Sequence, residues 1–149
     1  MTVKLSTGLR DKMLNGGAGG GLKGALNLGK INIYSGPQPL TADTAATGTL
    51  LGTVTVDGGG TGLTFEPPVN GTITKAAGEN WKATGLAAGT AGWFRFYPAS
   101  GDPSTTSTTE ARIDGSIASS GADVNLNNVS ITVGSPNTID LFSFTIPAQ

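Results

Sequence analysis

Apolar and polar side chains alternate with a period of two along most of the chain beyond residue 28, a pattern typical of half-buried β-strands. In residues 30–34, Ile31 and Ile33 share one face, and residues 50–56 repeat the pattern. Turn-forming Gly, Pro, Asn and Asp residues separate these runs from one another. The alternation predicts further short strands at residues 63–65, 72–74, 81–84, 91–98, 111–117, 129–133 and 138–146.

Residues 91–98 carry bulky side chains on both faces of their predicted strand. Phe94 and Phe96 share one face, whereas Trp93 and Tyr97 share the other. A strand that is covered on both faces is central in its sheet. We therefore expect a loop or a neighbouring subunit to cover Trp93 and Tyr97.

The spacing of the predicted strands indicates an all-β fold, a β-sandwich of about eight or nine short strands. A jelly-roll-like arrangement is favoured over an immunoglobulin-like one, because the Cys–Trp–Cys pattern of immunoglobulin domains is absent. Phe142 and Phe144 repeat the i, i+2 spacing of Phe94 and Phe96. We expect all four side chains in the core, on two central strands.

Near the N-terminus the apolar residues recur with helical spacing instead. Ser6 or Thr7 can cap a short helix, and the Asn and Gly residues at 15–17 can end it. The apolar side of this helix carries Leu5, Leu9, Met13 and Leu14. The sequence predicts one helix before the β-domain.

The Gly-rich segment 16–24 is interpreted as a flexible connector. The predicted domain organisation is an N-terminal arm, residues 1–24, followed by a single β-sandwich domain, residues 25–149. A lone helix of about ten residues is marginal in water, so we expect the arm to bury its apolar side on a partner subunit. The alternative is a helix that folds back over one end of its own sandwich.

Charged residues make up only 13% of the 149-residue chain, about half of the usual share. A chain of this length is long enough to bury one core without disulfides. The low charge is interpreted as a sign that other proteins cover much of the surface. Nine basic and ten acidic residues are scattered along the chain, so no basic stripe predicts binding to nucleic acid.

Histidine and cysteine are both absent. This removes the usual general base, the thiolate nucleophile and the commonest metal ligands. The chain is therefore predicted to have no enzymatic activity and no cofactor. No apolar run approaches the ~18 residues of a membrane span, and charges interrupt the N-terminus where a signal peptide would be apolar. We expect synthesis in a cytoplasm and no membrane partner.

Two glycine-rich stretches match the sequence patterns of phosphate-binding loops but lack the structural context of such loops. Residues 19–24 satisfy G-x-G-x-x-G, and residues 24–30 match the first seven positions of a P-loop. Both motifs need a strand before the glycines and a helix after them, and here the predicted order is reversed. Ile31 also stands where a P-loop has Ser or Thr. No nucleotide site is predicted.

Paired carboxylates leave a glycosidase and a calcium site as weaker alternatives. Glu110 and Asp114 share one face of a predicted strand with Arg112, where solvation is a sufficient explanation for them. Asp57 begins a Gly-rich turn but lacks the further Asp or Asn ligands of known calcium loops.

Aromatic side chains with polar tips offer another alternative, a platform for stacking on sugars. The candidates are Tyr34, Trp81, Trp93 and Tyr97. Packing in the core or at a subunit interface uses the same side chains equally well, and this interpretation is favoured.

Two stretches of the chain resemble small virion proteins of tailed bacteriophages. They are residues 28–51 (LGKINIYSGPQPLTADTAATGTLL) and 111–147 (ARIDGSIASSGADVNLNNVSITVGSPNTIDLFSFTIP), and the N-terminal STGLRDKML is similar as well. The pieces that carry the resemblance are IYSGPQP, ADTAATGTLL and the closing DLFSFTIPA. The resemblance implies a capsid decoration (cement) protein, a β-sandwich or jelly roll that binds outside the shell. It supplies no catalytic residues.

The leading hypothesis is a structural virion protein that lies on the capsid surface and stabilises it. Its expected partners are the major capsid protein and further copies of itself, as a dimer or trimer. The candidate partner contacts are Leu5, Leu9, Met13, Leu14, Trp81, Trp93 and Tyr97. The alternative function is a tail- or fibre-associated module, or a carbohydrate-binding β-sandwich.

Overall fold

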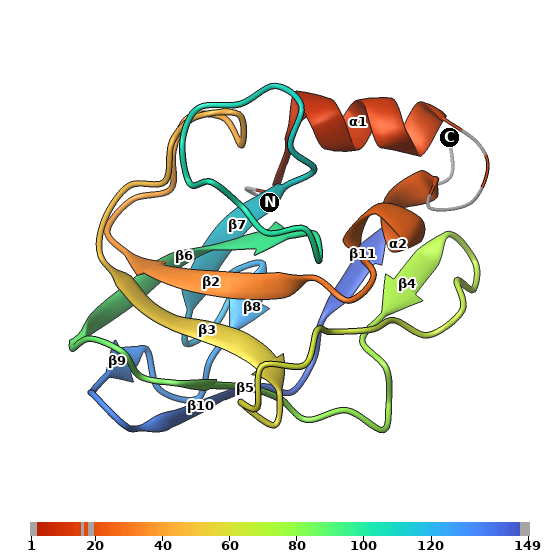
Figure 1. The fold of residues 1–149 in the computed structure, drawn as a ribbon. Coiled ribbons are helices and arrows are strands. Elements are labelled where there is room, and N and C mark those ends of the chain that lie inside the picture. The colour runs from red at the N-terminus through yellow and green to blue at the C-terminus, as the bar shows by residue number, and fades with distance from the viewer. Residues whose placement is uncertain (1–2, 16, 18–19, 147–149) are drawn as a thin grey trace.

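The computed structural model describes residues 3–15, 17 and 20–146, and this part of the chain is mostly β-structure (Figure 1). The elements in chain order are β1 (Lys4–Leu5), α1 (Thr7–Leu14), α2 (Gly21–Leu26), β2 (Lys30–Ser35), β3 (Leu50–Val56), β4 (Thr72–Thr74), β5 (Trp81–Thr84), β6 (Gly89–Tyr97), β7 (Ile113–Ala118), β8 (Val124–Asn125), β9 (Ser130–Ile131), β10 (Pro136–Ile139) and β11 (Ser143–Thr145). The predicted all-β, sandwich-like fold class is confirmed.

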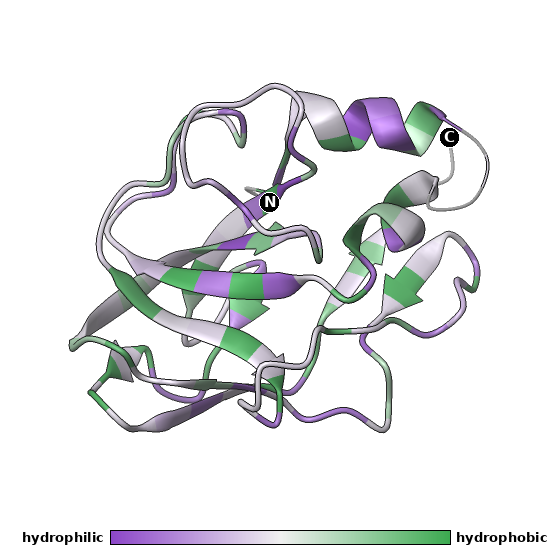
Figure 2. Cartoon of the chain, viewed as in Figure 1, coloured by the Kyte–Doolittle hydropathy of each residue, from purple (hydrophilic) through white to green (hydrophobic). Residues whose placement is uncertain are grey.

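One large sheet forms the body of the molecule, with the strand order β1-β7-β6-β2-β3-β5-β10. The short strand β8 pairs with β7, and β9 pairs with β6. The alternation of apolar and polar residues that predicts strands is visible along β2 and β3 in Figure 2. As expected for a strand with bulky side chains on both faces, β6 lies inside the sheet between β2 and β7.

The core lies between this sheet and a second sheet formed by β4 and β11. Phe94 and Phe96 of β6 are buried, as predicted. Phe65 stacks on Phe96 at 5.5 Å between ring centroids, and Phe142 lies 5.4 Å from the ring of Trp81. Phe65 lies between β3 and β4 and Phe142 directly precedes β11, so these contacts link the large sheet to the segments that flank the small one.

The prediction of one long closing strand over residues 138–146 is wrong. Ile139 of β10 pairs with Trp81 in the large sheet, whereas Phe144 of β11 pairs with Ile73 in the small sheet. The chain crosses between the sheets at residues 140–142. As a result Phe144 is only partly buried against the core, on a strand that is not central.

The N-terminal helix forms where it is expected, but it packs on its own chain. Ser6 caps it by accepting the N–H of Leu9 at 3.1 Å. Leu9 is fully buried in the hydrophobic core, and β1 pairs with β7. The helix therefore packs on its own core through Leu9, which corrects the expectation of a separate arm, whereas Leu14 of the predicted apolar side stays exposed. Contact of this segment with a partner subunit stays a prediction.

The connector predicted at residues 16–24 contains the start of a second helix, α2. Leu22, Ala25 and Leu26 are all buried. Burial of these side chains outweighs the low helix propensity of the surrounding glycines. Residues 16, 18 and 19 of the predicted connector lie outside the described residues. Independent folding of residues 25–149 stays a prediction.

Candidate functional site

The face of the large sheet opposite the aromatic core holds four charged side chains, here named the buried ion cluster. Arg95 on β6 donates from Nε and Nη2 to the two carboxylate oxygens of Asp114 on β7, at 2.8 and 2.7 Å. Arg112 donates from Nε to Oδ1 of Asp102 at 2.8 Å. Nη1 of Arg95 lies 3.7 Å from the other oxygen of Asp102. All four side chains are at most 1% exposed.

The buried ion cluster fastens two long loops onto the sheet. Arg95 donates from Nη2 to the carbonyl of Thr44, at 2.9 Å, in the loop between β2 and β3. Arg112 donates from Nη2 to the carbonyl of Thr105, at 2.9 Å, in the loop between β6 and β7. Each loop therefore has a fixed position relative to the strands beneath it.

The same loops hold the N-terminal helix. The carboxylate of Asp43 accepts the N–H and the hydroxyl of Thr7, at 2.7 and 2.6 Å. The hydroxyl of Ser6 donates to the carbonyl of Glu110 and accepts the N–H of Arg112 at 2.8 Å. Helix α1, the two loops and the large sheet are therefore linked through one hydrogen-bonded region.

The charges of the buried ion cluster offset one another. Burial on its own lowers the pKa of Arg95, but the hydrogen bond and the charge of Asp114 outweigh burial and raise that pKa. The prediction that solvation explains Glu110 and Asp114 is wrong for Asp114, which is buried and bound to Arg95. Among the described residues, Nη1 of Arg95 and Oδ2 of Asp102 are the buried atoms of the cluster without a hydrogen-bond partner, and they face each other as an ion pair. The other contacts of the cluster hold strands and loops together, and we interpret it as structural.

Trp93 lies beside this cluster and is covered by its own chain. Its ring stacks on Tyr34 with centroids 4.5 Å apart and planes inclined by 13°. The guanidinium of Arg95 lies 5.5 Å from the indole ring. Trp93 is fully buried and Tyr34 nearly so. Because the covering residues come from the same chain, no partner subunit is needed over Trp93.

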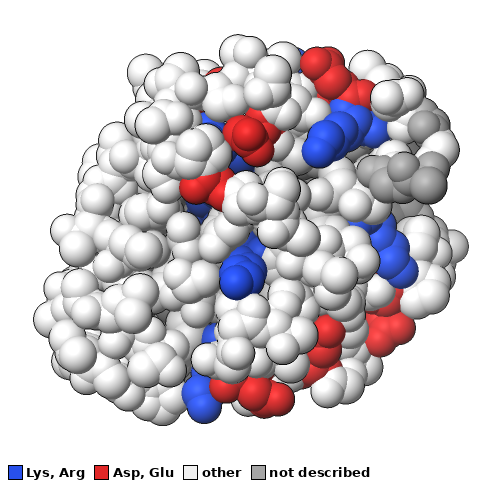
Figure 3. Space-filling model, in the orientation of Figure 1, with Lys and Arg blue, Asp and Glu red and all other residues white. Residues whose placement is uncertain are grey.

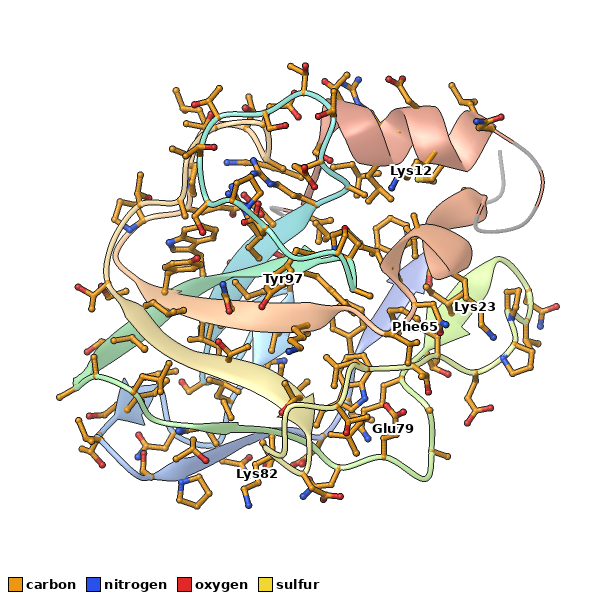
Figure 4. The ribbon with its side chains drawn as sticks, in the orientation of Figure 1. Lys12, Lys23, Phe65, Glu79, Lys82 and Tyr97 are labelled. Carbon is orange, nitrogen blue, oxygen red and sulfur yellow. The ribbon has the colours of Figure 1, made fainter. Side chains whose placement is uncertain are left out.

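Trp81 is also fully buried, in the aromatic core. Of the four aromatic residues considered for stacking on sugars, only Tyr97, which is labelled in Figure 4, retains partial exposure. Neither indole offers a ring face to a ligand. The residues of the carbohydrate-binding alternative therefore do not form a platform.

The remaining predicted contact residues lie on the N-terminal segment and differ in their exposure. Leu9 is buried, and Leu5 and Met13 are partly buried against the core. Leu14 is 89% exposed. The structure therefore does not bring the seven predicted contact residues together on one surface.

A different surface has the composition of a contact site. Residues 84–91 and 127–138, named here the neutral end, contain no Asp, Glu, Lys or Arg. They include the β5–β6 turn, strand β9 and the turn into β10. The left side of the view in Figure 3 carries no charged side chain, and Figure 1 places β9, β10 and the start of β6 there. Cores of protein interfaces are depleted of charge in the same way.

Two exposed apolar side chains lie on hydrogen-bonded turns of the neutral end. Leu86 is 59% exposed and Val133 is 70% exposed. Gly85 donates its N–H to Ser135 at 2.9 Å, and Gly134 donates to the carbonyl of Gly85 at 2.8 Å. A Cβ atom on Gly85 would lie 2.0 Å from the carbonyl oxygen of Thr132, so only glycine permits this close approach.

Sequence reasoning overlooked the neutral end, although a signal for it exists. Residues 124–139 contain no charged residue in a chain whose charges are otherwise scattered. The overall charge fraction suggests a covered surface, but only the positions of the charges indicate where that surface lies.

Other candidate chemistry has little support in the described residues. Within residues 3–15, 17 and 20–146, no three His, Cys, Asp or Glu side chains gather as metal ligands do. Asp57 is exposed at a positive φ of 54° in its Gly-rich turn. Over the same ranges, no helix is both long enough and apolar enough to span a membrane.

Comparison with known proteins gave no match, whether to family models, to curated proteins or to solved structures.

Proposed function

We propose that this protein is a structural component of a tailed-phage virion, which binds the outside of the assembled capsid through its neutral end. The observation that carries the proposal is the neutral end itself, with Leu86 and Val133 exposed on a surface without charge. A contact surface of this kind buries apolar area without leaving charges unpaired.

The rest of the molecule suits such a role. The buried ion cluster fixes two loops and helix α1 on the sheet. These segments are therefore already ordered, and binding does not have to supply the free energy to order them. The sequence resemblance to decoration proteins supplies the partner class, the major capsid protein, and an assembly of two or three copies. The proposed location is the capsid surface, after synthesis in the host cytoplasm.

The proposal is tested by adding purified protein to assembled heads that lack it and measuring how much sediments with them. Tails from the same virus serve as the second target, because a tail- or fibre-associated protein would bind those instead. Val133→Asp should weaken binding to heads by roughly tenfold or more, since an unpaired charge in a buried contact costs several kcal/mol.

Leu14→Asp is the matched control, because Leu14 is more exposed than Val133 and lies on α1, away from the neutral end (Figure 1). It should leave head binding unchanged. Loss of binding with Leu14→Asp but not with Val133→Asp would show that the N-terminal segment makes the contact. Absence of wild-type binding to heads would overturn the proposal.

A further inference from the structure

A groove runs between the large sheet and the small one, on the side where β1 and β11 lie. Val3 and Leu5, in and next to β1, line one part of it, and Ser143, Phe144 and Thr145 of β11 line another. Its volume is about 570 Å³. A second hollow of about 340 Å³ shares Asp123 and Ser143 with the groove and extends it toward Asp140.

Strand β11 presents an unpaired edge to this groove. Phe142 accepts the N–H of Lys75, and Ile146 donates to the carbonyl of Gly71. In an antiparallel pair, every second residue directs its backbone N–H and C=O groups at the partner strand. These two bonds show that residues 142, 144 and 146 are the ones that direct those groups at β4. Ser143 and Thr145 therefore direct their N–H and C=O groups the other way, and no described residue pairs with that edge.

Strand β1 presents a second edge that no described residue pairs with. Ser6 donates its N–H to the carbonyl of Arg112, and Leu5 is opposite Ile113 in the same register. Because Ser6 bonds to β7 and the bonding residues alternate, the N–H and C=O groups of Leu5 point away from β7. Leu5 also lines the groove. Within residues 3–15, 17 and 20–146, the groove is therefore bordered by two open strand edges, the arrangement that accepts an added strand.

The charge of the groove indicates what kind of strand it accepts. Asp140 is exposed, and in the described part of the chain it makes no hydrogen bond or ion pair. Asp123 also lines both hollows, but its carboxylate already accepts the N–H and the hydroxyl of Ser116, at 2.9 and 2.8 Å, so Asp140 carries the charge argument. Among the described residues, no Lys or Arg lines either hollow. A segment with a Lys or Arg near Asp140 complements this charge.

We propose that the groove binds an extended segment of a partner protein by strand addition. The segment pairs its backbone with β11, places alternate apolar side chains against Phe144 and Leu5, and sets a Lys or Arg beside Asp140. The inference rests on the groove alone and does not depend on attachment to a capsid through the neutral end.

The test uses a fluorescein-labelled eight-residue peptide of alternating Val and Thr with one central Lys, titrated with the full-length protein. Fluorescence anisotropy should show saturable binding. A peptide with Glu in place of Lys should bind roughly tenfold more weakly, and one with Pro at alternate positions should not bind. Hydrogen exchange of the Ser143 and Thr145 amides should slow when the Lys peptide is bound, because strand addition places these N–H groups in hydrogen bonds. Non-specific hydrophobic binding would not slow their exchange.

A matched pair of variants locates the site. Thr145→Pro removes an outward N–H from β11 and keeps the backbone hydrogen bonds to β4, although it also removes the exposed contact between the hydroxyls of Thr145 and Thr72. It should raise the Kd of the Lys peptide roughly tenfold. Thr138→Pro makes the same change on the outward edge of β10, away from the groove, and should leave the Kd unchanged. Asp140→Lys should reverse the preference between the Lys and Glu peptides.

Three results would overturn the proposal. The first is no binding of the Lys peptide at millimolar protein. The second is an equal effect of Thr145→Pro and Thr138→Pro. The third is a protein that self-associates in sedimentation and becomes monomeric with Thr145→Pro, because a second copy of the chain would then occupy the groove.

Discussion

Glu79, which is labelled in Figure 4 and precedes β5, holds the indole of the buried Trp81 through its carboxylate. Trp81 donates from Nε1 to Glu79 at 2.7 Å, and Thr64 donates its N–H and hydroxyl at 3.0 and 2.6 Å. Burial on its own raises the pKa of Glu79, but these hydrogen bonds and the charge of Lys75 outweigh burial and lower it. The ionised carboxylate is therefore the form that stabilises the core.

The pKa of Glu79 predicts a specific pH dependence of stability. The pKa of Glu79 in the folded protein lies below its ordinary value of 4.5. The stabilisation from the ionised carboxylate is therefore complete above pH 4.5, and it is lost as the pH falls through the folded-state pKa. Glu79→Gln should lower the free energy of unfolding at pH 7 by roughly 1–3 kcal/mol, toward the lower end because the side chain is partly exposed.

Urea denaturation at several pH values checks this prediction. The difference between wild type and Glu79→Gln should shrink as the pH falls below about 4. Glu66→Gln is the control, because Glu66 accepts a single exposed N–H, from Ala77. A difference that stays constant with pH would show that the charge of Glu79 contributes nothing to stability.

The buried ion cluster makes a second prediction about single residues. Asp114→Ala leaves the guanidinium of Arg95 buried without its main counter-ion, and should cost roughly 3–5 kcal/mol of unfolding free energy. The double variant Arg95→Met with Asp114→Ala should lose less than the sum of the two single losses. Asp11→Ala, on the exposed side of α1, is the control. Additive losses in equilibrium denaturation would contradict the assigned pairing.

Helix α1 depends on tertiary contacts for its position. Its close approach to the β6–β7 loop requires glycine at position 8, where a Cβ atom would lie 2.3 Å from the carbonyl oxygen of Thr109. The helix has only eight residues, too few to be stable alone. Its position therefore depends on burial of Leu9 and on the hydrogen bonds of Ser6 and Thr7.

Gly8→Ala distinguishes a docked helix from a free arm. Alanine raises the intrinsic helix propensity by about 1 kcal/mol, so a free arm would be unaffected or slightly stabilised. In the docked helix the added methyl group displaces α1 from Thr109, and the thermal midpoint should fall by an amount equivalent to about 1–3 kcal/mol. Lys12→Ala, at an exposed position of α1, is the control. A raised midpoint with Gly8→Ala would contradict docking.

Several elements could be predicted from the sequence because local pattern and tertiary structure agree there. The alternation at residues 50–56 gives β3 with its observed ends, Leu50–Val56. The strands β8 and β1 have only two residues each and carry too little pattern to be recognised. Helix α2 is hidden by its glycines, since only burial against the core reveals why it forms.

At the scale of the whole molecule, charge is distributed unevenly. The buried ion cluster removes two arginines and two aspartates from the surface of a chain that has few charges. The neutral end has none to begin with. The side chains exposed at the neutral end are apolar or uncharged polar. Such a surface is more typical of a protein contact than of a surface that stays in solvent.

The candidate contact surface could be predicted only in part. A low charge fraction indicates covered surface, and this much follows from composition. Large aromatic residues are common at interfaces, which favours Trp81 and Trp93 as contact residues, yet both are buried in their own chain. The turns that carry Leu86 and Val133 are hydrogen-bonded to each other although they are far apart in sequence, and no local pattern encodes such a pairing.

The most direct test of the neutral end as the contact surface is hydrogen–deuterium exchange of the protein, free and bound to assembled heads. Bound protein should take up deuterium more slowly in the β5–β6 turn around Leu86 and the β9–β10 turn around Val133. Helix α1 should exchange at the same rate in both states. Protection confined to α1, or no protection at either turn in protein that sediments with heads, would contradict the account.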